Sequence, residues 1–113
     1  MAVINEFGGE IPETYGVPVE EIQEGIKHGV RKINIDTDLR LASTGAIRRF
    51  LAKNPSEFDP RKYFKEATKA MTDIVKARYL AFGCEGQASS IRVVAMETMA
   101  SRYLAGGLKP RVS

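Results

Sequence analysis

Residues 31–40 read RKINIDTDLR, and this stretch carries the strongest indication of fold in the chain. It overlaps a β-type apolar run over residues 30–35, and a helical pattern of apolar residues follows without a spacer. The junction holds four polar residues, namely Asn34, Asp36, Thr37 and Asp38. Barrels and doubly wound α/β proteins present polar groups in this way, at the carboxyl end of a strand beside a helix N-terminus. Unpaired backbone N–H groups there attract anions such as phosphate.

The composition is that of a globular protein. The 113 residues suffice for one domain, and the 43% hydrophobic content includes no apolar run long enough to span a bilayer. The N-terminal sequence MAVINEFGGE lacks the charged-then-apolar pattern of a signal peptide. The single Cys84 excludes an internal disulfide and fits a reducing cytosol, so we expect a cytoplasmic protein without a membrane partner. With His28 as the one histidine, a self-contained zinc site is not expected.

The net charge of +3 raises the question of an anionic partner. A basic excess suits nucleic acid or a phosphorylated substrate. The basic residues alternate with Asp and Glu, however, and no alternation of basic and aromatic residues appears. Solvated helix faces are therefore the preferred interpretation, and no nucleic-acid partner is expected.

Local signals in the first half predict loop, helix, strand and helix in turn. Residues 1–16 are expected to be loop. A helix is expected over residues 18–29, because proline suits a first helical turn and glycine suits a helix end. Residues 30–35 form the one convincing strand. A second helical pattern, residues 39–51, ends at the Asn-Pro pair of residues 54–55.

The second half predicts two more helices. Asp59 and Pro60 form a strong helix start, and the helix that follows is expected to stop near Gly83. Ser89 or Ser90 is expected to cap a last helix that ends at residues 106–107. Its inward residues would be Ile91, Val94, Ala95 and Met99. We expect residues 105–113 to be a flexible tail.

One strand cannot form a sheet, and a buried parallel strand needs neighbours. The order helix, strand, helix, helix, helix therefore indicates the closing part of a larger βα array. We expect residues 1–113 to be a single partial domain, mostly helical as an isolated chain.

The NIDTD sequence matches neither an EF-hand calcium loop nor a Walker phosphate loop. An EF-hand loop starting at Asn34 needs glycine and glutamate where this chain has Leu39 and Gly45, so calcium is rejected. A Walker phosphate loop is absent from the sequence. On spacing alone, a strand end with a polar helix cap explains NIDTD.

A resemblance over most of the chain favours a functional role for NIDTD over a simple helix cap. Residues 8–102 resemble the C-terminal part of the class II fructose-bisphosphate aldolases, and most closely the Calvin-cycle-like subtype. Three stretches follow one another in family order: GGEIPETYGVPVEEIQEGI, RKINIDTDLRLASTGAIRRFL and NPSEFDPRKYF. The resemblance implies the C-terminal portion of a (β/α)8 TIM barrel, with residues 30–35 as the eighth strand. It also implies a lyase of glycolysis, gluconeogenesis and the Calvin cycle.

The family cleaves fructose 1,6-bisphosphate to dihydroxyacetone phosphate and glyceraldehyde 3-phosphate, with a zinc ion as Lewis acid. By resemblance, the Asn34 amide is directed at the enediolate oxygen and is the catalytic residue. Asp36 and Thr37 line the pocket for the phosphate of the dihydroxyacetone half. Arg61 matches an arginine that reaches the distal phosphate, in some members across a subunit interface, and Arg40 is a second candidate.

The chain departs from the family pattern in two ways, so only part of the family's chemistry is expected of it. The zinc ligands and the general acid of the family lie on earlier strands and loops, and His28 falls in none of those motifs. A barrel also needs about 250 residues. We therefore expect the chain alone to be inactive and to need the N-terminal part of the barrel as its partner. We expect the complete protein to be a homo-oligomer that acts on a sugar bisphosphate.

Three hypotheses remain open. The chain is the C-terminal piece of an aldolase from a truncated or split gene, or it is a non-enzymatic remnant that acts as a small helical interaction module. The third, a basic nucleic-acid binder, rests on charge alone and is the weakest. The DNA upstream of the Met1 codon would distinguish the first two.

Overall fold

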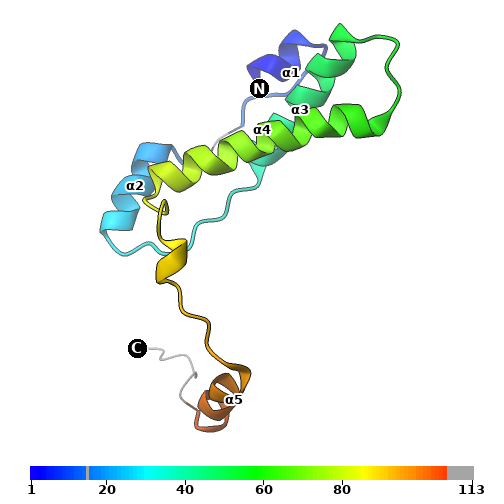
Figure 1. Cartoon of the computed structure of the whole chain (residues 1–113). Coiled ribbons are helices and arrows are strands. Elements are labelled where there is room, and N and C mark those ends of the chain that lie inside the picture. The colour runs from blue at the N-terminus through cyan, green and yellow to red at the C-terminus, as the bar shows by residue number, and fades with distance from the viewer. Residues whose placement is uncertain (15, 107–113) are drawn as a thin grey trace.

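The computed structural model describes residues 1–14 and 16–106, and its order of elements runs from α1 to α5 (Figure 1). The α-helices are α1 (Ala2–Glu6), α2 (Val19–Lys27), α3 (Thr37–Lys53), α4 (Pro60–Ala81) and α5 (Met96–Leu104). A single 3₁₀ turn, η1 (Ala88–Ser90), lies between α4 and α5. In the described part of the chain, no helix is long and apolar enough to cross a bilayer.

The centre of the structure is an antiparallel hairpin of α3 and α4. Ala46 of α3 and Ala67 of α4 are both buried, and such small side chains let two helix backbones approach closely. The start of α4 is as the sequence predicts. The Asp59 side chain accepts a hydrogen bond from the Arg61 N–H at 3.0 Å, and Pro60 occupies the first helical position.

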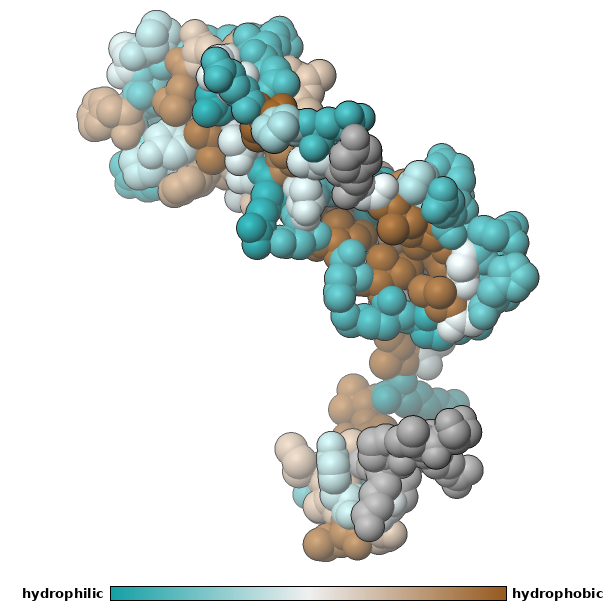
Figure 2. Space-filling model, turned by 180° about the vertical axis from the view of Figure 1, so that it is seen from behind, coloured by the Kyte–Doolittle hydropathy of each residue, from teal (hydrophilic) through white to brown (hydrophobic). Residues whose placement is uncertain are grey.

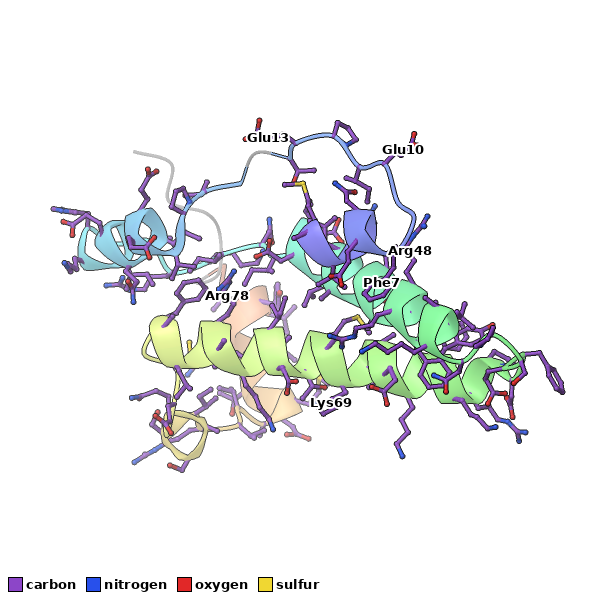
Figure 3. The ribbon with its side chains drawn as sticks, turned by 90° about the horizontal axis from the view of Figure 1, so that it is seen from above. Phe7, Glu10, Glu13, Arg48, Lys69 and Arg78 are labelled. Atoms are coloured by element: carbon purple, nitrogen blue, oxygen red, sulfur yellow. The ribbon has the colours of Figure 1, made fainter. Side chains whose placement is uncertain are left out.

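Helix α1 corrects the expectation of a loop over residues 1–16. Ile4 is only 1% exposed because α1 packs on α3 near Gly45. A Cβ at Gly45 would lie 3.4 Å from Ile4 Cγ1, which is an ordinary van der Waals contact. Arg48 Nη1 also donates to the Phe7 carbonyl at 3.4 Å, from α3 to the end of α1 (Figure 3). Tertiary contacts therefore stabilise a helix for which the local sequence has no capping signal.

Helix α2 forms as expected. Acidic residues Glu20 and Glu21 occupy its first turn and Lys27 its last, which suits the helix dipole. Gly29 follows the helix with a φ of +104°, a conformation that favours glycine.

The expected strand is not formed in this chain. Residues 30–36 run between α2 and α3 without strand pairing, and the described residues contain no strand. The reason is physical, because a β run without a neighbour has no hydrogen-bonding partner. The expectation of a mostly helical isolated chain is confirmed.

The last helix starts later than expected. Ser89 and Ser90 lie in η1 and do not cap α5, which begins only at Met96. Ile91 and Val94, predicted to face inward, are exposed because the chain reaches no packing partner there. Of the expected flexible tail, residues 107–113 lie outside the described residues.

The chain buries far less surface than a compact protein of its size. Its radius of gyration is 20.1 Å, whereas a compact domain of this length has about 13 Å. Its accessible surface is 9440 Å², against about 6,200 Å² for a compact monomer of equal mass. Apolar surface gathers in a hollow where α2 and the end of α4 meet (Figure 2). Such a surface fits a segment that packs against further protein.

Candidate functional site

The junction singled out in the sequence lines a hollow of about 640 Å³. Its walls come from the loop before α2, from α2 itself, from residues 30–36, from the first turns of α3 and from Arg78 of α4. Three of the predicted site residues, Asn34, Asp36 and Thr37, meet in this hollow. The polar residues of the junction therefore line one hollow, and their role in binding stays a prediction.

Asn34 contacts a basic residue that the prediction omitted. Lys32 Nζ donates a hydrogen bond to Asn34 Oδ1. The contact uses the amide oxygen, so the Asn34 amide nitrogen still presents N–H donors. Lys32 lines the same hollow. The sequence held the signal for this, because residues two apart in an extended segment share one face.

Asp36 binds Arg40 instead of capping α3. Arg40 Nε lies 2.9 Å from Asp36 Oδ1, and Arg40 Nη2 lies 2.8 Å from Asp36 Oδ2. Among the described residues, the Asp36 side chain accepts no capping hydrogen bond from α3. Its carbonyl oxygen accepts from the N–H groups of Leu39 and Arg40, at 3.0 and 3.1 Å. The first turn of α3 thus has no side-chain cap and lines the hollow, and a helix N-terminus favours negative charge.

Asp38 is neutralised by a residue 40 positions away. Arg78 Nη2 lies 2.8 Å from Asp38 Oδ2, and Figure 3 shows Arg78 pointing from α4 toward the start of α3. This pair lowers the negative charge beside the hollow, which an anionic ligand would otherwise meet. Sequence reasoning missed Arg78, and no local signal could have found it, because the pairing depends on the hairpin.

Arg61 lies at the other end of the hairpin. It begins α4, whereas the hollow lies at the start of α3, and the 17 residues of α3 separate the two by about 25 Å. Arg61 is 89% exposed. The structure therefore does not bring Arg61 to Asn34 within one chain.

Asp59 holds the Arg61 guanidinium. Arg61 Nη2 lies 2.6 Å from Asp59 Oδ2, and Arg61 Nε lies 3.0 Å from Asp59 Oδ1. The guanidinium keeps the pKa of the Asp59 carboxyl below its ordinary value, and the same contact raises the pKa of Arg61. Arg61 therefore stays charged and keeps its remaining N–H donors available to an anion.

The side chains of the described residues do not fit a zinc ion. They contain no group of three His, Cys, Asp or Glu side chains that could hold a metal. His28 Nε2 instead lies 3.0 Å from Glu24 Oε1, one helical turn away on α2. Lys27 and His28 lower the pKa of Glu24. Both basic side chains thus engage the Glu24 carboxylate at the end of α2.

The start of α3, which carries no side-chain cap, thus lies beside convergent polar side chains, an arrangement that other proteins use to bind anions. Residues 13–87 match the family model described as fructose-bisphosphate aldolase class-II. The chain belongs to the class II fructose-bisphosphate aldolase family.

Relatives agree with this assignment. The chain is 69% identical over 113 residues to a fructose-bisphosphate aldolase of Pseudomonas aeruginosa, covering all of this chain and 32% of that protein. It is 59% identical over 108 residues to a fructose-bisphosphate aldolase of Nostoc, covering 96% of this chain and 30% of the relative. It is 57% identical over 111 residues to fructose-bisphosphate aldolase 2 of Rhodobacter capsulatus, covering 98% of this chain and 97% of that sequence. The chain spans about a third of the length of the first two relatives.

Proposed function

We propose that this chain forms one end of the substrate site of a class II fructose-bisphosphate aldolase of the Calvin-cycle-like subtype. In this proposal, residues 30–35 are the eighth strand of a (β/α)8 barrel. The extended, unpaired state of this segment and the apolar hollow beside it support the proposal (Figure 2). Neighbouring strands and helices would pair with the segment and cover the hollow.

The proposed reaction is the reversible aldol cleavage of fructose 1,6-bisphosphate. The C4 hydroxyl would give its proton to a base outside this chain, C4 would become the aldehyde carbon, and the electron pair of the breaking C3–C4 bond would form an enediolate on the dihydroxyacetone phosphate half. That enediolate would then take up a proton at C3. The aldehyde half leaves as glyceraldehyde 3-phosphate. Each half carries one phosphate, so the site needs two separate anion-binding regions.

The start of α3 is proposed to bind the phosphate of the dihydroxyacetone half. This is the observation that carries the proposal, because Asp36 turns to Arg40 and leaves the helix end without a side-chain cap. The Thr37 hydroxyl and the first backbone N–H groups of α3 would then donate to the phosphate. Asp36 would orient Arg40 and the loop, without facing the anion itself. Barrel enzymes often build a phosphate site after their last strands.

Asn34 is proposed to stabilise the enediolate. It precedes the proposed phosphate site by a few residues and lines the same hollow, so its amide would lie near the reacting half of a bound substrate. An N–H donor aimed at an oxygen that gains charge stabilises the transition state more than the ground state. Lys32, bonded to the amide oxygen, would hold the Asn34 side chain in that orientation.

Arg61 is proposed to bind the distal phosphate of a substrate held by a second copy of the protein. Its distance from the hollow of its own chain supports this arrangement. Its high exposure leaves it able to enter a neighbouring site. The proposal therefore requires a homo-oligomer. The zinc ion is proposed to bind residues outside this chain.

A chimera tests the proposal. This chain would replace the matching segment of the Pseudomonas aeruginosa relative, to which it is 69% identical. We expect the zinc-loaded chimera to cleave fructose 1,6-bisphosphate, measured by coupling the triose phosphates to NADH oxidation. A chimera that folds and binds zinc but releases no triose phosphate would favour the non-enzymatic interaction module.

A further inference from the structure

Helix α5 stands apart from the α3–α4 hairpin. Figure 1 shows it below the rest of the structure, at the end of an extended segment that follows η1. Its large apolar side chains face solvent, with Met96 78% exposed and Leu104 89% exposed. A short helix gains most of its stability from packing its apolar face, so this helix requires a surface to bind.

The residues of α5 form an amphipathic pattern. At 100° per residue, Met96, Met99 and Tyr103 lie on one face. Glu97 and Arg102 lie at the two borders of that face. Thr98 and Ser101 lie on the opposite side. The helix therefore offers an apolar stripe with an acidic border and a basic border.

A groove with matching properties lies at the end of α4. This groove, which we call the Leu80 groove, has a volume of about 800 Å³. Its lining includes Lys76, Tyr79, Leu80, Cys84, Glu85 and Ile91. Tyr79, Leu80 and Ile91 are exposed apolar residues, whereas Lys76 and Glu85 supply one charge of each sign.

We propose that α5 of one copy of this chain docks in the Leu80 groove of a second copy, and that the second copy returns the same contact. The apolar stripe of α5 would cover Leu80 and Tyr79. Glu97 would pair with Lys76 of the other copy, and Arg102 with Glu85. A reciprocal exchange of this kind is a closed twofold interface. It does not depend on the proposed aldolase function.

The connection to α5 favours a second copy over the groove of the same chain. Ile91 itself lines the groove, so only residues 92–95 separate the groove from the helix. The segment is extended at both ends, with φ −80° and ψ 116° at Ile91 and φ −60° and ψ 147° at Ala95. Residues 92–95 read RVVA and contain no glycine or proline for a reversal. Short hinges of this type favour domain swapping.

Sedimentation equilibrium of the 113-residue chain tests the contact. We expect a monomer–dimer equilibrium that Tyr103→Asp weakens by roughly a hundredfold, because a charge would enter an apolar groove. Thr98→Asp, on the opposite face of α5, is the matched control and should leave the dissociation constant within about threefold. Circular dichroism would verify equal helix content. A monomeric parent chain, or equal effects of the two substitutions, would overturn the proposal.

A mixing experiment distinguishes exchange between copies from docking within one chain. One variant carries Glu97→Lys and Arg102→Glu, and the other carries Lys76→Glu and Glu85→Lys. Each alone should dimerise at least about tenfold more weakly, because like charges would meet in both of the proposed ion pairs. An equimolar mixture should regain dimer formation close to that of the parent, since each helix then meets a complementary groove. If mixing restores nothing, α5 does not dock on a second copy.

Discussion

Arg78 Nη2 lies 2.8 Å from Asp38 Oδ2, and this ion pair joins the first turn of α3 to the last turns of α4. The Arg78 side chain is 26% exposed and that of Asp38 46% exposed. The pair fixes the start of α3 against the hairpin, and Arg78 also lines the hollow that holds Asn34. The geometry of the proposed phosphate site thus depends on a contact between two helices.

A double-mutant cycle should measure this dependence. Asp38→Ala and Arg78→Ala, singly and together in the 113-residue chain, should give a coupling of about 1 kcal/mol in the free energy of unfolding by urea. The reference pair is Lys69 and Asp73, 3.4 Å apart on the solvent face of α4 (Figure 3), where coupling should stay below about 0.5 kcal/mol. Equal coupling energies in the two pairs would show that the interhelical ion pair stabilises the fold no more than an ion pair on the surface of one helix.

Local signals predicted α2 and α4 well, whereas the predicted start of α5 was wrong. Asp59 with Pro60, and Pro18 with Gly29, fix helix ends through capping and backbone geometry alone, and the structure has both. Helix α1 was missed, because Ile4 is buried by α3 and not by its neighbours in sequence.

The candidate site was also predictable only where its residues are close in sequence. One hollow is lined by Asn34, Asp36 and Thr37. These residues lie within four positions of one another in the sequence, so the chain itself brings them together. Arg78 comes from 40 residues further on, and only the hairpin brings it there. The opposite position of Arg61 likewise depends on the length of α3.

Asn34→Ala in the aldolase chimera should lower kcat far more than it raises KM. The amide is proposed to donate to charge that exists only after the C3–C4 bond begins to break, so its loss should slow cleavage by roughly a hundredfold or more. The measurement is steady-state kinetics with fructose 1,6-bisphosphate, with circular dichroism as the control for folding. A kcat within a few-fold of the parent would remove Asn34 from the reacting centre.

The 113-residue chain alone should neither retain zinc through dialysis nor cleave fructose 1,6-bisphosphate. A catalytic zinc site needs three protein ligands, and His28 is engaged with Glu24 in the described structure. Metal content by atomic absorption, together with the coupled assay, checks both statements. Stoichiometric zinc with measurable turnover would contradict the proposed location of the metal ligands.

The Glu57–Lys62 ion pair before α4 should stabilise the fold less at acidic pH. Lys62 lowers the pKa of the Glu57 carboxyl by a hydrogen bond, and the N–H of Asp59 acts in the same direction. Because folding depresses this pKa, the contribution to stability is complete above the ordinary value of about 4.5 and is lost as pH falls through the lowered value. The midpoint temperature of thermal unfolding should therefore fall more steeply between about pH 5 and pH 3 in the parent than in Glu57→Gln. Parallel curves would show that this pair contributes nothing.

Arg61→Ala in the chimera should separate binding of the bisphosphate from chemistry on its other half. We expect kcat/KM for fructose 1,6-bisphosphate to fall roughly ten- to a hundredfold, because a charged donor to the distal phosphate is lost. Proton exchange on dihydroxyacetone phosphate, which has no distal phosphate, should be spared.

Arg61→Lys is the matched control for the same measurement. It keeps the charge but cannot form the two-point contact of a guanidinium, so its effect should be intermediate. The distance of Arg61 from the hollow of its own chain adds a second test. Mixed oligomers of Arg61→Ala and Asn34→Ala chains should regain activity, because a site with its own Asn34 would receive Arg61 from the neighbour. If the two reactions slow equally in Arg61→Ala, or if mixing restores nothing, Arg61 does not serve the distal phosphate of a second copy.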